Sequence, residues 1–100
     1  MHSIEWAAGL FEGEGNIYKR PNENRYSLTL AMNDEDVVDS FHELFPMGKR
    51  YVRTNRDNPL YVWQIENKSG VQWVLNKLLP FFHNRRAYKA LNILDDLELA

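Results

Sequence analysis

The sequence predicts an α+β fold in which a four-stranded antiparallel sheet has its helices on one face. Apolar residues recur at helical spacing in four segments, and four further segments have the composition and patterning of strands. These segments follow one another in the order αββαββαα, without linkers or low-complexity stretches. Consecutive strands joined by short turns pair antiparallel, and such sheets commonly bury one face and leave the other exposed.

The first helix is expected over residues 3–13, and a hairpin follows it. Ser3 is suited to cap this helix, and Trp6, Leu10 and Phe11 recur at helical spacing. The segments GNIYKRP and RYSLTLAM are predicted to be strands, and apolar and polar residues alternate along the second. The stretch PNEN between them is rich in Pro and Asn, which favour a turn.

A second helix is expected in NDEDVVDSFHELF. Asn33 or Asp34 is its cap, and acidic residues occupy the first turn, where the helix dipole favours them. The second hairpin is predicted in KRYVRTNRDNPLYVWQIEN, with NRDNP as its turn. Two amphipathic helices complete the fold, one in SGVQWVLNKLL, ended by Pro80, and one in HNRRAYKALNILDDLEL.

Alternation along the strands assigns their side chains to the two faces of the sheet. Toward the helices it places Leu28, Leu30, Val52, Trp63 and Ile65, and Trp6 and Trp73 are also expected in the core. On the opposite face it places Tyr18, Arg20, Arg25, Ser27, Thr29, Tyr51, Arg53, Asn55 and Gln64. Side chains of these types can read base edges in a DNA major groove. A solvated outer face, which most antiparallel sheets have, explains the same pattern without DNA.

The composition fits one domain spanning residues 1–100. The chain has no cysteine, which excludes disulfides and thiolate metal sites, and no apolar run long enough to cross a membrane. We therefore expect a soluble, cytoplasmic protein. The net charge is −2, yet seven of the 12 basic residues fall within residues 16–33 and 49–56, together with a single acid, Glu23. Because a DNA duplex responds to local charge, this segregation is compatible with DNA binding.

The stretch WAAGLFEGEG, from Trp6 to Gly15, places two acids among three glycines. Gly9 and Gly13 are four residues apart and form a helix face without side-chain bulk, which suits close packing against a second copy of the helix. Glu14 falls at the C-terminal end of this helix, where the carbonyl groups already give a negative potential, so a metal cation would stabilise it there. A surface acid beside a glycine cap is the simpler interpretation of the same residues.

The segment AAGLFEGEG, residues 7–15, resembles the motif that names the LAGLIDADG homing endonucleases. The identical positions are Ala8, Gly9, Leu10, Gly13 and Gly15, and glutamates replace the two aspartates of the motif at Glu12 and Glu14. The resemblance extends to the αββαββ order and to the segments SLTLAMND, YVR and LLPFFHNRRAYKALNIL.

This resemblance implies a saddle-shaped sheet that lies along the DNA major groove. Since the chain carries one copy of the motif, it also implies a homodimer acting on a near-palindromic site in double-stranded DNA. The motif helices would form the dimer interface, here through Ala8, Gly9, Glu12 and Gly13. Glu14 would bind Mg²⁺ or another divalent cation at the cleaved phosphates, and Arg85 or Arg86 would order water and phosphate. The implied reaction is metal-dependent hydrolysis of one phosphodiester bond in each strand, leaving short 3′ overhangs.

The sequence also departs from the family. Asp34 and Val38 stand where some dimeric members have polar or basic residues that assist the active site, and the chain is short and acidic for the family. A catalytically inactive DNA-binding or regulatory protein with the same fold is therefore the alternative function. A small domain that binds a protein through its sheet is a third.

Overall fold

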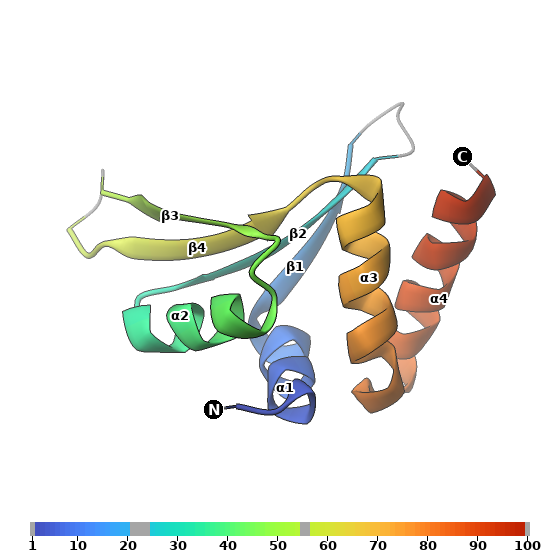
Figure 1. Cartoon of the computed structure of the whole chain (residues 1–100), viewed down its shortest axis with the longest axis horizontal. Helices are drawn as coiled ribbons and strands as arrows, with labels where there is room; N and C mark the ends of the chain where they lie inside the picture. The colour runs from blue at the N-terminus through green and yellow to red at the C-terminus, as the bar shows by residue number, and fades with distance from the viewer. Residues whose placement is uncertain (1, 21–24, 55–56, 100) are drawn as a thin grey trace.

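The computed structural model describes residues 2–20, 25–54 and 57–99, and its helices and strands follow the predicted order. They are α1 (Ile4–Glu14), β1 (Gly15–Lys19), β2 (Tyr26–Met32), α2 (Glu35–Leu44), β3 (Lys49–Arg53), β4 (Leu60–Ile65), α3 (Lys68–Leu78), the 3₁₀ turn η1 (Leu79–Phe81) and α4 (Asn84–Leu99) (Figure 1). Pro80 lies in the turn that follows α3. The expected turn at 21–24, and residues 55–56 of the second turn, lie outside the described residues.

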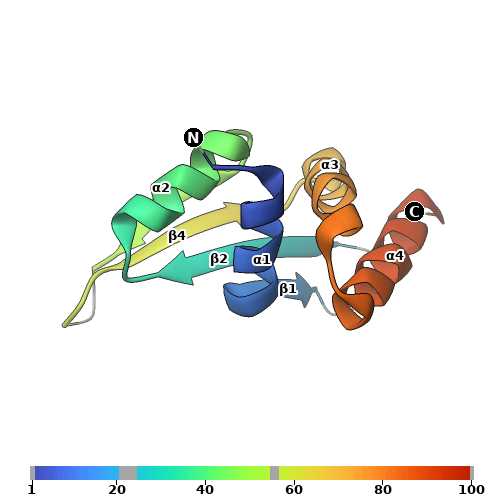
Figure 2. The same ribbon diagram turned by 90° about the horizontal axis from the view of Figure 1, so that it is seen from below.

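The four strands form one antiparallel sheet in the order β1-β2-β4-β3. Each predicted hairpin is present, and the two hairpins join through β2 and β4 at the centre of the sheet. Figures 1 and 2 show the four helices on the same side of this sheet. The predicted α+β class and the one-sided arrangement of helices are therefore confirmed. None of the helices in the described part of the chain has the length and apolar character needed to cross a membrane.

Helix α1 begins and ends as its sequence dictates. The Ser3 hydroxyl accepts the backbone N–H of Trp6 at 3.0 Å, so the predicted cap is confirmed. The helix passes directly into β1 at Gly15, whose φ of −80° and ψ of 157° are extended. A Cβ atom at Gly15 would overlap the buried ring of Phe11. Gly15 is therefore required for space beneath the strand and does not form an exit turn of unusual conformation.

Helix α2 is joined to the sheet by polar contacts at its start. Asp34 occupies the N-cap position, but its side chain makes no capping hydrogen bond. The Asn33 side chain instead donates to the Pro59 carbonyl at 3.0 Å, which ties the entry of α2 to the start of β4. The predicted acidic first turn is present in Glu35 and Asp36.

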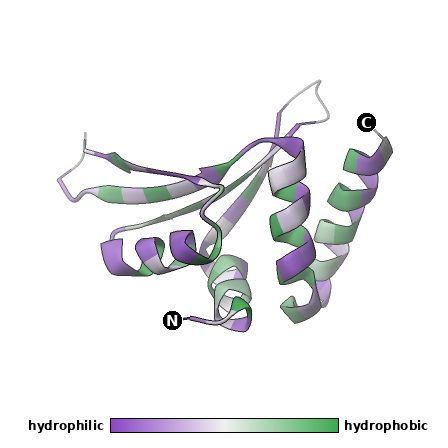
Figure 3. Cartoon of the chain, in the orientation of Figure 1, coloured by the Kyte–Doolittle hydropathy of each residue, from purple (hydrophilic) through white to green (hydrophobic). Residues whose placement is uncertain are grey.

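The core lies between the sheet and the helices, around Trp63 of β4. Trp63 is fully buried, its ring meets that of Phe41 edge-on with centroids 4.8 Å apart, and its indole N–H donates to the Phe45 carbonyl at 3.0 Å. Leu28, Leu30 and Ile65 are buried beside it, as alternation predicts. Figure 3 shows more and less hydrophobic residues interspersed along β4. Val62, which the register places on the opposite face of the sheet, is buried as well.

Two apolar residues, Val52, predicted to face the helices, and Trp73, predicted in the core, are exposed. Val52 is paired with Tyr61 and faces the helix side of the sheet, but it is 38% exposed because β3 is an edge strand and α2 packs on β2 and β4. Trp73 is 43% exposed on the outer side of α3, where its ring meets Phe45 edge-on. The predicted face of Val52 is therefore confirmed, although the residue is not covered. The prediction that Trp73 lies in the core was wrong. Local periodicity does not show where the covering helices end.

Candidate active site and nucleic-acid interface

The strand register places the predicted DNA-reading residues together on the face of the sheet opposite the helices, here called the outer face. Directly paired residues of an antiparallel ladder point to the same side. Thr29, for example, pairs with both Asn16 and Gln64, and these three side chains share the outer face. Of the predicted residues within the strands, the register places on this face Tyr18, Ser27, Thr29, Tyr51, Arg53 and Gln64.

Arg20 and Arg25 continue the outer face beyond the ends of β1 and β2. The Arg20 N–H donates to the Arg25 carbonyl at 2.9 Å, so the hairpin pairing and its alternation extend to these residues. The predicted residue Asn55 lies outside the described residues.

Two exposed polar residues on the outer face were missed by the sequence analysis. Asn16 pairs with Thr29, and Lys49 pairs with Gln64. Each lies two residues from a tyrosine of the predicted set, so the same alternation would have found them. Arg50, although part of the basic cluster in the sequence, lies on the helix side and contacts Glu35 and Asp39 at 2.9 Å each. It therefore adds no charge to the outer face.

Ser27 is the exception among the predicted DNA-reading residues that the structure describes, because only 7% of it is exposed. Arg20, beyond the end of β1, pairs with Glu66, beyond the end of β4, at 3.5 Å. This ion pair therefore passes over β2, the strand between them, which carries Ser27. The hydroxyl of Ser27 is thus less accessible to a ligand than its neighbours.

Gly9 and Gly13 form an open face on α1. Both are exposed, and a Cβ atom built on either meets nothing within 4 Å. Glycine in a helix interior costs about 1 kcal/mol relative to alanine, so packing within the described chain does not explain these two residues. Ala8, predicted to share this face, is instead fully buried with Ala7 and Phe11. The open face of α1 is therefore centred on the two glycines.

The Glu12 carboxylate joins α1 to the start of α4. One oxygen accepts the His83 backbone N–H at 2.6 Å, and the other lies 2.9 Å from His83 Nδ1. Negative charge is favourable at a helix N-terminus, and His83 directly precedes α4. The hydrogen bond between the side chains lowers the pKa of Glu12 and raises the pKa of His83. The carboxylate of Glu12, predicted at the dimer interface, thus connects two helices of its own chain.

Of the two arginines predicted beside the motif, the structure brings Arg86 to it. The Arg86 Nη2 donates to the carbonyl oxygens of Glu12, at 3.1 Å, and Gly15, at 3.3 Å. These carbonyls lie at the C-terminal end of α1, where the helix dipole makes the potential negative. Arg85 is exposed and makes no such contact with described residues.

Glu14 is the last residue of α1 and is exposed. Its carboxylate forms no hydrogen bond or ion pair with the residues that the structure describes. Among those same residues, no three His, Asp or Glu side chains are grouped in a way that would hold a metal ion. A single chain therefore contributes one carboxylate that has no hydrogen-bond or ion-pair partner among the described residues. Carboxylate oxygens are ligands of the kind that Mg²⁺ prefers.

Solved structures of homing endonucleases resemble this chain. Homing endonuclease I-CvuI, in complex with its target and in the presence of calcium, matches with a TM-score of 0.73 at 22% identity, over 95% of this chain and 65% of that one. Group I intron-encoded I-CeuI, complexed with DNA, matches with a TM-score of 0.70 at 21% identity, over 96% and 54%. The LAGLIDADG meganuclease I-CpaMI, bound to uncleaved DNA, matches with a TM-score of 0.74 at 9% identity, over 98% and 36%.

No protein-family model and no curated protein matches the sequence. The chain spans at most 65% of the length of the three structures named above. Identities of 22% and below show a common fold, and the function has to be argued from the residues of this chain. The fold is that of the LAGLIDADG homing endonucleases, as the glycine–acid motif of the sequence predicts.

Proposed function

We propose that this protein is a site-specific DNA endonuclease that acts as a homodimer and uses Mg²⁺ or another divalent cation. The observation that carries the proposal is the position of Glu14. Its uncommitted carboxylate ends a helix whose open face is made of glycines, and the next residue begins the sheet. The DNA in complexes of structurally similar homing endonucleases supports the choice of substrate.

The homodimer follows from the open face of α1. A second copy of the helix placed against Gly9 and Gly13 would approach more closely than side chains elsewhere on α1 allow. A two-fold axis through this contact would bring the two Glu14 residues to the same side of the dimer. The pair of carboxylates, which one chain lacks, would then complete a site for hard cations.

The chemistry of the available ligands fits a divalent metal. Glu14 would hold it together with the partner copy's carboxylate, water and phosphate oxygens. When bound, the metal lowers the pKa of the attacking water and neutralises charge on the scissile phosphate. I-CvuI structures were obtained with calcium and with magnesium, which supports a cation of this type.

Arg86 supports Glu14 without touching its carboxylate. Its guanidinium holds the carbonyls of Glu12 and Gly15, on either side of Glu14 in the sequence. It thereby fixes the backbone that carries Glu14 and offsets the negative potential at the end of α1. This placement favours Arg86 over Arg85 as the basic residue of the active site.

The outer face supplies the contact with DNA. Arg20, Arg25 and Arg53 would neutralise phosphates or bind guanine, and the amide of Gln64 suits adenine. Two copies related by a two-fold axis would read a near-palindromic site, with one strand cut at each Glu14. The DNA-associated, cytoplasmic location expected from the sequence belongs to the same proposal.

The test is the substitution Glu14→Gln, which removes the charge and keeps the size of the side chain. A preferred site is first selected from a randomised DNA library, and its cleavage is then measured with Mg²⁺. We expect cleavage to fall by more than about 100-fold, because a metal ligand matters at least as much as the groups that orient it. Binding of the uncut site should be retained.

The matched control is Glu43→Gln, which removes an exposed carboxylate of α2 on the helix side of the sheet. It should cut as the wild type does. Equal cleavage by Glu14→Gln would refute the role of Glu14. A wild type that binds its site with or without Mg²⁺ and never cuts it would support the inactive DNA-binding protein instead.

A further inference from the structure

A continuous set of polar contacts crosses the outer face from β3 toward the end of β1. We call the five side chains that form it the sheet-face network: Arg53, Tyr51, Gln64, Glu66 and Arg20. Arg53 Nη2 donates to Tyr51 Oη at 3.3 Å, and Tyr51 Oη donates to Gln64 Oε1 at 3.0 Å. Gln64 Nε2 donates to Glu66 Oε1 at 2.9 Å, and Glu66 Oε2 pairs with Arg20 Nη2 at 3.5 Å.

Glu66 determines which way the Gln64 amide points. An ionised carboxylate only accepts hydrogen bonds, so the NH₂ group of Gln64 must face Glu66. The carbonyl oxygen of the amide then faces Tyr51, whose hydroxyl donates to it while its oxygen accepts from Arg53. If the amide were rotated by 180°, its oxygen would face a carboxylate, which gives no hydrogen bond. The network therefore holds one orientation of Gln64.

Glu66 also has the wrong charge for a surface that merely attracts DNA. Among the described residues that the register and alternation place on the outer face, it is the only acid. Its side chain is 43% exposed, so it would lie near the phosphates of a bound duplex and repel them. A contribution to DNA affinity therefore does not explain why an acid stands at position 66. Control of the orientation of the neighbouring Gln64 side chain does explain it.

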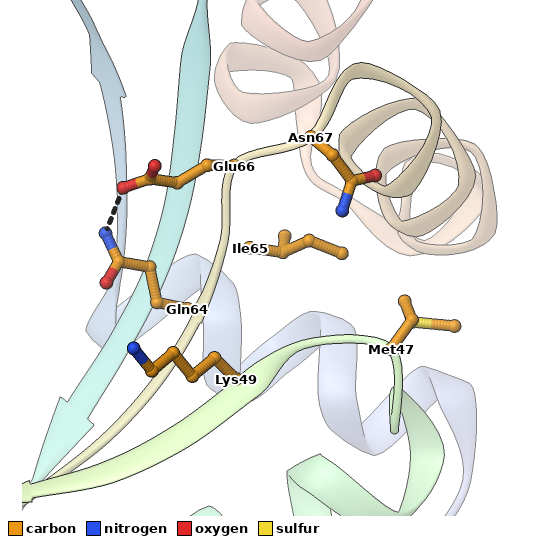
Figure 4. A pocket seen from close by; sticks show the side chains of 6 residues that line it. All are labelled: Met47, Lys49, Gln64, Ile65, Glu66 and Asn67. Carbon is orange, nitrogen blue, oxygen red and sulfur yellow. Dashed lines mark hydrogen bonds between the residues drawn. The ribbon is translucent and has the colours of Figure 1, made fainter.

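Gln64 is partly exposed on the outer face. Gln64 and Glu66 border a hollow of about 280 Å³ at the end of β4, which Met47, Lys49, Ile65 and Asn67 also line. Figure 4 shows these six side chains and the hydrogen bond between the Gln64 amide and the Glu66 carboxylate. A base edge that reaches Gln64 on the outer face would meet an amide that is already oriented.

We propose that Glu66 is a positioning residue that sets the base preference of Gln64. The proposal rests on the DNA-binding part of the function proposed above. An amide with a fixed orientation offers its donor and its acceptor at set places, which matches the N6 and N7 atoms of adenine. An amide free to rotate presents either group at the same place and tolerates more than one base. Glu66 thus lowers the affinity for DNA in general and raises the discrimination between sequences.

The experiment compares the wild type, Glu66→Gln and the control Glu43→Gln in binding to a half-site library randomised at every position. For Glu66→Gln we expect equal or tighter binding overall, because a negative charge is lost. Its preference should fall by about tenfold at one base pair of each half-site, the order expected for one good base contact. Tyr51→Phe, which removes the other hydrogen bond to the amide, should relax the preference at the same base pair.

Two outcomes of this binding experiment would overturn the proposal. One is an unchanged preference at every position in Glu66→Gln. The other is a loss of affinity that is uniform over all sequences, which would mean that Glu66 merely supports the sheet.

A measurement without DNA separates this proposal from the proposed function. The two Nε2 protons of Gln64 should give NMR signals that shift in Glu66→Gln and not in Glu43→Gln. If this shift is present but the wild type binds no DNA, the proposed function fails while the positioning of the amide stands. If the wild type binds DNA selectively and the signals do not shift, the positioning role is refuted.

Discussion

The Glu12 carboxylate holds both the backbone N–H and the imidazole of His83, 71 residues further along the chain. This contact joins the last turn of α1 to the first residue before α4. Arg86, in the first turn of α4, donates a hydrogen bond to the carbonyl of the same Glu12. The end of α1, where Glu14 lies, is thus held by the start of α4.

The Glu12–His83 pair should make the stability of the fold depend on pH. The pKa of His83 is raised above 6.5, so its contribution is fully present below pH 6.5 and is lost as the pH rises through the raised value. The pKa of Glu12 is lowered below 4.5, so its contribution is present above pH 4.5 and is lost as the pH falls through the lowered value. The pair should therefore stabilise the fold most between pH 4.5 and pH 6.5. Measuring Tm across this pH range tests the prediction.

His83→Gln is the variant for this measurement, since it keeps the backbone N–H that Glu12 also binds. Near pH 6 the Tm of this variant should be lower than that of the wild type. Above the raised pKa of His83 the two Tm values should be nearly equal. His2→Gln, at an exposed residue near the N-terminus, is the control. A constant difference in Tm between His83→Gln and the wild type at all pH values would contradict the ionic part of the contact.

Substitution should separate Arg86 from Arg85. Arg86→Leu removes two hydrogen bonds to the end of α1, and we expect it to lower the free energy of unfolding by about 1.5–3 kcal/mol, the range for hydrogen bonds that involve a charged group. Arg85→Leu, at an exposed neighbour, should change it by less than about 0.5 kcal/mol. Urea unfolding of both variants measures this difference. Equal losses would mean that the contact of Arg86 with α1 does not stabilise the fold.

The open face of α1 should be the dimer contact. Gly9→Leu places a large side chain where the chain itself has nothing within 4 Å, so helix content should be retained. Two such helices can no longer approach closely, and the particle mass from sedimentation equilibrium should fall from that of a dimer to that of a monomer. Asn76→Leu, on the exposed side of α3, adds the same bulk elsewhere and should leave the dimer intact. A dimer that persists in Gly9→Leu would place the interface elsewhere.

The basic residues of the outer face should determine how DNA binding responds to salt. Arg25→Gln removes an exposed cation from that face, and the slope of log K against log salt should become shallower by about 0.9 if Arg25 neutralises one phosphate. Arg50 lies on the helix side and contacts Glu35 and Asp39, so Arg50→Gln should leave the slope unchanged. If both variants altered the slope equally, DNA would not be bound by the outer face alone.

Local sequence pattern predicted most of the fold because its rules act over a few residues. The cap of α1 is a hydrogen bond that the Ser3 hydroxyl accepts from the backbone N–H three residues later, and the faces of the strands follow a period of two. The buried positions of Leu28, Leu30, Trp63 and Ile65 are confirmed for this reason. Val52 and Trp73 differ because their exposure depends on where other elements end.

The candidate site was predicted less completely because its parts come from distant segments. Arg85 and Arg86 are neighbours in the sequence, and only the placement of α4 against α1 distinguishes them. The bond between Glu12 and His83 depends on the same placement. The sheet-face network joins side chains from both hairpins, so it follows from the strand order, which the sequence pattern does not give.

The direct passage from α1 into β1 fixes the position of Glu14 relative to the outer face of the sheet. Glu14 ends the helix, Gly15 begins the strand beneath the ring of Phe11, and Gly15 is paired with Leu30 at the centre of the sheet. No residue between them can absorb a change in length. For the DNA cleavage proposed above, the number of base pairs between the recognised bases and the scissile phosphate would therefore be set by the covalent geometry of the chain. One residue inserted before Tyr18 would turn that side chain to the other face of the sheet, and the fixed spacing between Glu14 and the outer-face side chains would be lost.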